Sequence, residues 1–158
     1  MSKSQDPVFV EFSEICHKLG LRVTSPRLVV YRHIRGNQTH PIVDEIWEAT
    51  QKDLPNISRE SVYRILTSFA EKGLIYQLDR ADVVARYDSN PLRHDHFFCE
   101  RCGRIFDFNA EEIDPIVRKT ATPIGQINRV EARVLGICQD CLSKEEALGS
   151  HLAETSKD

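Results

Sequence analysis

The chain has 158 residues, which is enough for one ordinary domain or two small ones. Its 41% hydrophobic and 28% charged residues are typical of a soluble globular protein, and no apolar run is long enough for a membrane-spanning helix. The net charge of −3 does not by itself indicate a nucleic-acid partner. The amino terminus has no apolar stretch of the signal-peptide type, so we expect a cytoplasmic protein whose thiols stay reduced.

Apolar residues at helical spacing predict four helices in the first half of the chain. The expected helices cover residues 8–19, residues 25–35, a third segment that opens at Thr39-His40-Pro41, and residues 58–72. Gly20 and Gly73 are candidate C-caps, and Ser58 is a candidate N-cap. Cys16 follows the helical pattern and is expected to be a small core residue.

Two β-patterned stretches follow the helices, at residues 74–79 and 83–88, and the turn Arg80-Ala81-Asp82 joins them. Helices followed by a β-hairpin make a winged helix-turn-helix, in which the third and fourth helices form the turn unit and the hairpin is the wing. We therefore expect residues 1–88 to be a DNA-binding domain. They carry 12 basic and 12 acidic side chains, so a DNA-binding role depends on where individual arginines lie.

In the second half of the chain we expect a short hinge at 89–93, a mixed domain of helices and strands at 94–145, and a polar tail at 146–158. Within the mixed domain we expect strands near 94–99, 104–108 and 126–137, a helix over 110–120, and a short helix after residue 141. The predicted fold class is therefore α+β, with an α/β domain after the winged helix.

Four of the five cysteines form two matched pairs, Cys99-x-x-Cys102 and Cys138-x-x-Cys141. Two intervening residues let both thiolates bind one ion from a tight turn, and two such pairs supply the four sulfurs of a closed tetrahedral zinc site. The alternatives are a pair of disulfides or a redox dithiol. Nothing in the chain indicates an oxidising compartment, so the pattern favours structural Zn²⁺.

A His-Asp-His run precedes the first cysteine pair. If residues 94–99 form a strand, His94 and His96 share one face and Cys99 lies on the other, so histidines and cysteines would serve two different ions. Imidazoles mixed with carboxylates, such as Asp88 and Asp107, suit an exchangeable ion such as iron or manganese. The alternative is a pair of solvated surface histidines.

The first turns of the fourth predicted helix are crowded with side chains that can reach DNA. They are Ser58, Arg59, Ser61, Tyr63 and Arg64. Arginine can bond guanine at two points, serine can bond a phosphate, and tyrosine can pack on a thymine methyl group or a sugar. Arg80, at the tip of the predicted wing, is a candidate backbone or minor-groove contact. The alternatives are an ordinary amphipathic helix and a solvated turn residue.

From about residue 8 to Cys141, these features together resemble the Fur family of metal-sensing bacterial repressors. The matching residues are Ser61-Val62-Tyr63-Arg64, the run from His94 to Gly103, and Cys138-x-x-Cys141. The resemblance implies that the winged helix is joined by a hinge to an α/β dimerisation domain, with structural zinc in the cysteine pairs. It also implies a regulatory Fe²⁺ or Mn²⁺ between the domains, held by His40, Asp88, His94, His96 and Asp107. Bound metal would select the homodimer shape whose two recognition helices match a palindromic double-stranded operator.

Asp107 distinguishes two subfamilies, because the peroxide-responsive repressors usually have Asp at this position and the ferric uptake regulators usually have Glu. The resemblance therefore implies a sensor in which iron lets hydrogen peroxide oxidise His40 or His94. The alternative is a regulator that senses the availability of iron, or less readily of zinc or manganese. A zinc enzyme and a zinc-stabilised interaction module are further alternatives. We expect no enzyme, because no His-x-Glu or His-Glu-x-x-His pattern is present.

Overall fold

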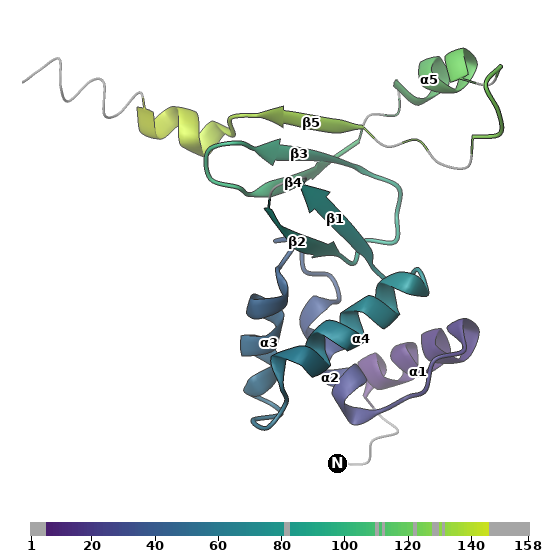
Figure 1. Ribbon diagram of the computed structural model, residues 1–158, viewed down its shortest axis with the longest axis vertical. Coiled ribbons are helices and arrows are strands. Elements are labelled where there is room, and N and C mark those ends of the chain that lie inside the picture. Colours follow the sequence, from purple (N-terminus) through teal and green to yellow (C-terminus); the bar gives the residue numbers. More distant parts are fainter. Residues whose placement is uncertain are drawn as a thin grey trace, which may run out of the picture. The chain divides into compact units, whose positions relative to one another are not determined.

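The computed structural model describes residues 6–80, 83–109, 111, 113–121, 123–127, 130 and 132–145. The chain divides into two compact units, residues 1–92 and 93–158, which are coloured purple to teal and teal to yellow in Figure 1. Among the described residues, no helix is long and apolar enough to cross a membrane. The expected polar tail, residues 146–158, lies outside the described residues.

Four helices form most of the first unit, as predicted. They are α1 (Pro7–Leu19), α2 (Ser25–Ile34), α3 (Val43–Gln51) and α4 (Arg59–Glu71). Side chains of Asp6, Thr24 and Ser58 accept hydrogen bonds from the first-turn amides of α1, α2 and α4, which explains where these helices begin. Gly20 ends α1 with a left-handed φ of 66°, which glycine adopts without steric cost.

The third helix begins later than the sequence pattern indicates. It starts at Val43 rather than at Thr39, because His40 has a left-handed φ of 51° and the proline that follows disfavours helical backbone at His40. The Glu45 carboxylate accepts a hydrogen bond from the Ile42 N–H at 2.8 Å, which fixes the new start of α3. His40 therefore lies in the loop before α3 rather than in its first turn.

The core of the first unit joins the inner faces of all four helices. Phe12 of α1 stacks on Tyr31 of α2 at a ring-centroid distance of 4.8 Å and meets Phe69 of α4 edge-on at 6.0 Å. Cys16 is fully buried in this cluster, as expected for a core residue. Leu66 is also fully buried there, so the apolar stripe of α4 faces the core and its polar stripe faces outward.

A two-stranded antiparallel hairpin, β1 (Tyr76–Arg80) and β2 (Val83–Asp88), follows the helices and is the predicted wing. β1 begins two residues later than expected because the Leu74 N–H still bonds the Phe69 carbonyl at 2.9 Å at the end of α4. The structure describes the backbone of Arg80 at the end of β1 but not its side chain.

The second unit is built on a three-stranded sheet. Its elements are β3 (Asp95–Cys99), β4 (Ile105–Phe108), α5 (Ile113–Ala121) and β5 (Arg133–Gly136), followed by a helical segment at 139–145. The strand order is β4-β3-β5, with β3 antiparallel to β4 and parallel to β5 (Figure 1). A parallel pair needs a crossover connection, and the segment with α5 supplies it. The strand expected over 126–137 is shorter than predicted and covers only the residues that pair with β3.

Candidate metal centres and nucleic-acid interface

The sheet register of the second unit brings its two cysteine pairs together. Cys99 ends β3 opposite Gly136 of β5, so the turns that follow the two strands lie side by side. The first turn closes with a Gly103 N–H bond to the Cys99 carbonyl at 2.9 Å, and the second with a Cys141 N–H bond to the Cys138 carbonyl at 2.9 Å. Two matching turns therefore face each other across the end of the sheet.

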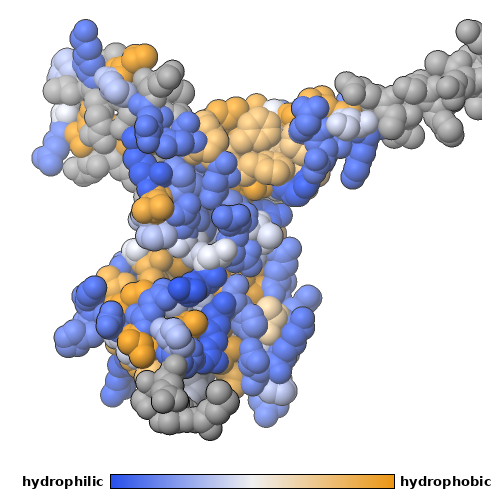
Figure 2. Space-filling model, turned by 180° about the vertical axis from the view of Figure 1, so that it is seen from behind, coloured by the Kyte–Doolittle hydropathy of each residue, from blue (hydrophilic) through white to orange (hydrophobic). Residues whose placement is uncertain are grey.

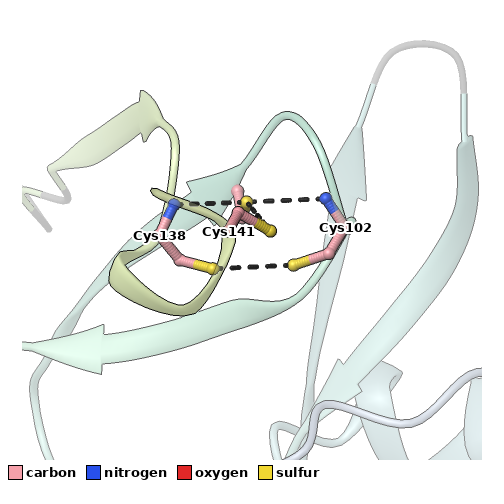
Figure 3. A group of neighbouring side chains, drawn as sticks. Cys102, Cys138 and Cys141 are labelled. Atoms are coloured by element: carbon pink, nitrogen blue, oxygen red, sulfur yellow. Dashed lines mark hydrogen bonds between the residues drawn. The ribbon is translucent and has the colours of Figure 1, made fainter. Parts of the chain in front are cut away.

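The four sulfur atoms fit one tetrahedral zinc ion. The Sγ–Sγ distance is 3.9 Å between Cys99 and Cys141 and 3.7 Å between Cys102 and Cys138, and all four ligand atoms lie within 4.8 Å of one another (Figure 3). Zinc–sulfur bonds of about 2.3 Å would place tetrahedral sulfurs roughly 3.8 Å apart. All of these cysteines are free thiols in the structure, so the alternative of a pair of disulfides is not realised, and the close grouping of all four sulfurs favours a metal site over a redox dithiol.

Nearby donors favour the thiolate form of Cys99 and Cys102, whereas burial raises the pKa of Cys141 to about 12. The backbone N–H groups of Cys102 and Cys138 donate to Cys99 Sγ at 3.5 and 3.3 Å, and they lower the pKa of Cys99 to about 6. The Arg104 guanidinium donates to Cys102 Sγ at 3.3 Å and holds the pKa of Cys102 below its ordinary value. Because metal binds the thiolate, these donors make both groups better ligands at neutral pH.

A loop of the first unit holds His40 in an uncommon backbone conformation. The Asn37 side chain accepts from the backbone N–H of Thr39 at 2.9 Å and from its hydroxyl at 2.7 Å, which makes a tight turn just before His40. The Arg86 guanidinium, on β2, donates to the His40 carbonyl at 2.9 Å. A left-handed φ at a residue other than glycine costs about 1 kcal/mol and is concentrated at functional sites.

The end of β2 brings Asp88 to the same loop. The Tyr87 N–H bonds the Pro41 carbonyl at 3.0 Å, which fixes the strand end beside His40. Both side chains are buried, and each offers one ligand atom within 4.8 Å of the other. Asp88 Oδ1 also accepts from the Asn90 N–H at 2.8 Å, which orients the carboxylate. The first unit therefore positions one imidazole and one carboxylate close enough together to bind the same ion.

The second unit holds a matching group of two imidazoles and one carboxylate. His94 Nε2 and His96 Nε2 lie 3.0 Å apart, and Asp107 Oδ1 lies 3.6 and 3.7 Å from them. The antiparallel register explains this grouping, because Asp107 on β4 pairs directly with His96 on β3. Both histidines are buried, which removes the alternative of solvated surface histidines for this structure.

The two imidazole nitrogens are close enough to bind one ion. The 3.0 Å separation of His94 Nε2 and His96 Nε2 is an ordinary hydrogen-bond distance, and the group leaves positions open for further ligands. Two histidines and one carboxylate with open positions are the usual ligands of non-haem Fe²⁺.

Helix α4 presents the predicted DNA-contacting residues on its outer face. Arg59, Ser61, Tyr63 and Arg64 are exposed, whereas Val62 is fully buried in the core. Ser58 has a structural part as well, because its hydroxyl caps α4 by accepting from the Ser61 N–H at 3.1 Å and pairs with the Ser61 hydroxyl at 2.8 Å.

Both arginines of this face are already paired with carboxylates. Arg59 forms a two-point ion pair with Asp44 of α3, with an Nη2–Oδ2 distance of 3.1 Å, and Arg64 Nε bonds Glu60 Oε1 at 2.9 Å. Exposed pairs of this kind are weak, so a DNA phosphate or base edge can displace the carboxylates. Nothing in the sequence pointed to Asp44 as the partner of Arg59, because Asp44 comes from a neighbouring helix.

Comparison with known proteins decides the family. The model of the ferric uptake regulator family matches residues 18–131. The peroxide-responsive repressor PerR of Staphylococcus aureus strain Mu50 is 32% identical over 146 residues, which cover 85% of this chain and 99% of the relative. The chain belongs to the ferric uptake regulator family. It is therefore a metal-dependent transcriptional repressor, and members of this family are transcriptional regulators rather than enzymes.

Solved structures of the ferric uptake regulator family share the fold. A zinc-bound manganese uptake regulator is 26% identical with a TM-score of 0.63, over 80% of this chain and 97% of that chain. The Helicobacter pylori ferric uptake regulator Fur is 24% identical with a TM-score of 0.73, over 85% and 91% of the two chains. These likenesses confirm the predicted α+β class, with an N-terminal winged helix and a C-terminal α/β dimerisation domain.

Proposed function

We propose that this repressor senses hydrogen peroxide. It binds its operator while a regulatory Fe²⁺ or Mn²⁺ is held, and it leaves DNA when peroxide oxidises a ligand histidine, His40 or His94, of the iron form. The observation that carries the proposal is the group of His94, His96 and Asp107, whose two imidazoles and one carboxylate suit a redox-active Fe²⁺. The identity of 32% with a peroxide-responsive repressor supports it independently.

The regulatory ion would take ligands from both units: His40 and Asp88 from the first, and His94, His96 and Asp107 from the second. Each group is prepared within its own unit, by the loop before α3 in one case and by the β3–β4 register in the other. An ion that needs both groups stabilises only the conformation in which they meet. Bound Fe²⁺ would supply the electron that cleaves the O–O bond of peroxide, and Mn²⁺ would leave the histidines intact.

The structural ion would be Zn²⁺, held by Cys99, Cys102, Cys138 and Cys141. This zinc would join the turn after β3 to the turn after β5 and so stabilise the second unit. The sulfur–sulfur distances of 3.7 and 3.9 Å support a closed site of four sulfurs.

The repressor would act as a homodimer on a palindromic operator. Figure 2 shows apolar surface gathered over the three-stranded sheet of the second unit, where Phe106 and Val134, which both pair with Phe97, are exposed. A second copy would cover this surface, and two-fold symmetry would present two α4 helices to two half-sites. On α4, Ser58, Arg59, Ser61, Tyr63 and Arg64 would contact DNA, with Arg80 from the wing. The repressor would bind this operator in the cytoplasm.

Operator binding by the anaerobic protein tests the proposal, with the iron form and the manganese form measured before and after a low dose of peroxide. We expect loss of binding only in the iron form, with a mass gain of about 16 Da, one oxygen atom, on a peptide that contains His40 or His94. Unchanged binding and unchanged mass in the iron form would refute peroxide sensing and leave a regulator of metal availability. A mass gain on cysteine-containing peptides instead would show that peroxide is sensed by the thiols and not by the histidines.

A further inference from the structure

One corner of the sulfur cluster is open to solvent. Cys102 is exposed, whereas Cys99, Cys138 and Cys141 are at most 6% exposed. An exposed thiolate is the ligand that a small oxidant reaches first. Since Cys102 Sγ lies 3.7 Å from Cys138 Sγ, oxidation at this corner can close a bond between the two sulfurs after modest movement.

Arg104 covers this corner. Its Nε donates to Cys102 Sγ at 3.3 Å, and its Nη2 donates to Cys138 Sγ at 3.5 Å, so one planar guanidinium bonds one sulfur from each cysteine pair. Nη2 also donates to Asp140 Oδ2 at 2.7 Å, and the guanidinium lies over the Phe106 ring at 5.3 Å from its centroid. The carboxylate and the ring hold the guanidinium in place over the two sulfurs.

We propose that Arg104 is a positioning residue that protects the Cys102–Cys138 edge of the zinc site from oxidation by peroxide. The inference rests on the zinc site proposed above. It concerns a different set of side chains from those that would hold the regulatory ion. Arg104 would thus make the zinc site resistant to hydrogen peroxide, which is the oxidant that the repressor would sense at its other metal site.

The reaction that Arg104 would slow has two steps. The Cys102 thiolate attacks one peroxide oxygen, the O–O bond breaks, and the products are a sulfenic acid and hydroxide. The Cys138 thiolate then attacks the sulfenic sulfur and displaces a second hydroxide, which leaves a disulfide. Two sulfurs are each oxidised by one electron, both peroxide oxygens are reduced, and the site loses two of its four ligands. Hydrogen bonds from a cation withdraw electron density from sulfur and occupy its lone pairs, so the first attack is slower.

Release of zinc to a coloured chelator tests the inference, with and without hydrogen peroxide. The measurement uses full-length protein without iron, in a His96→Ala background, so that the regulatory site cannot contribute. We expect Arg104→Gln to lose zinc about tenfold faster in peroxide than its parent, because one charge-assisted hydrogen bond is worth a factor of that order. The rate in chelator alone should change much less. Arg104→Lys, which keeps the charge but reaches only one sulfur, should be intermediate.

Arg101→Gln is the matched control, because Arg101 lies in the same turn and its side chain bonds the Cys141 carbonyl at 3.2 Å and pairs with Glu145, with no side-chain hydrogen bond to a sulfur among the described residues. Its peroxide rate should equal that of the parent. Equal peroxide rates for the parent and Arg104→Gln would overturn the inference. The inference would also be overturned if Arg104→Gln accelerated zinc release equally with and without peroxide, since Arg104 would then only stabilise the turn. If Arg104→Gln does not fold with zinc, Asp140→Asn, which releases the guanidinium, replaces it with the same expectation. A parent protein without zinc would refute the zinc site itself.

Discussion

Replacing Arg64 with alanine is the sharpest test of which surface reads DNA. Arg64 is 76% exposed at its side chain, and its pair with Glu60 is worth only a few tenths of a kcal/mol. The substitution should therefore leave the stability of the first unit almost unchanged. A two-point contact with guanine is worth about 1–3 kcal/mol, so operator affinity should fall about 5- to 150-fold.

Fluorescence anisotropy with operator and scrambled duplexes, at several salt concentrations, separates two kinds of contact. A base contact predicts a loss on the operator alone, whereas a phosphate contact predicts a similar loss on both duplexes and a salt slope smaller by about 1. Arg35→Ala is the matched control, because Arg35 is an exposed arginine of the same unit that pairs with Glu11 away from α4. Wild-type operator affinity in Arg64→Ala, with the dimer and zinc intact, would refute the assignment of α4.

Three further outcomes follow from the sites described above. His96→Ala should give a folded, zinc-loaded dimer whose operator binding no longer depends on iron or manganese, and metal-dependent binding in a titration would contradict the five-ligand site. Cys102→Ser should lose zinc and with it the folded second unit or the dimer, which metal analysis and size-exclusion chromatography measure. Burial and the 2.7 Å hydrogen bond to Glu11 raise the pKa of Tyr31 to about 12. A raised pKa in the folded state contributes stability that is complete below the ordinary value near 10 and is lost as pH rises through 12. Absorbance near 295 nm should therefore show a late tyrosine component that Tyr31→Phe diminishes, and a Tyr31 contribution already complete near pH 10 would contradict this burial.

The helices of the first unit were predictable because each signal is local. Apolar spacing marks the buried stripe of α4, and Ser58 marks its start, so three or four neighbouring residues decide each boundary. The start of α3 was predicted wrongly. The cause is again local, but it is a backbone conformation that residues other than glycine rarely adopt. The left-handed backbone at His40 depends on a turn made by the Asn37 side chain, which a helical pattern does not reveal.

Contacts between distant segments were harder to predict. The position of Asp107 beside His96 follows from the β3–β4 register, whereas the sequence indicated it only by the nearness of Asp107 to the histidines along the chain and by the resemblance to a known family. The pair of Arg59 with Asp44 and the bond of Arg104 to Cys138 Sγ were not predicted at all. These contacts join side chains from different elements, and no spacing along the chain reports them.

The loop before α3 and the wing form one hydrogen-bonded piece. Strand β2 donates to the His40 carbonyl through Arg86 and to the Pro41 carbonyl through the Tyr87 amide, and the same strand ends in Asp88. A shift of either proposed metal ligand in this unit, His40 or Asp88, would therefore move the strand that carries the wing, without passing through the hydrophobic core. Chemical damage to one imidazole would in this way be transmitted as a displacement of the hairpin, over a path only a few peptide bonds long.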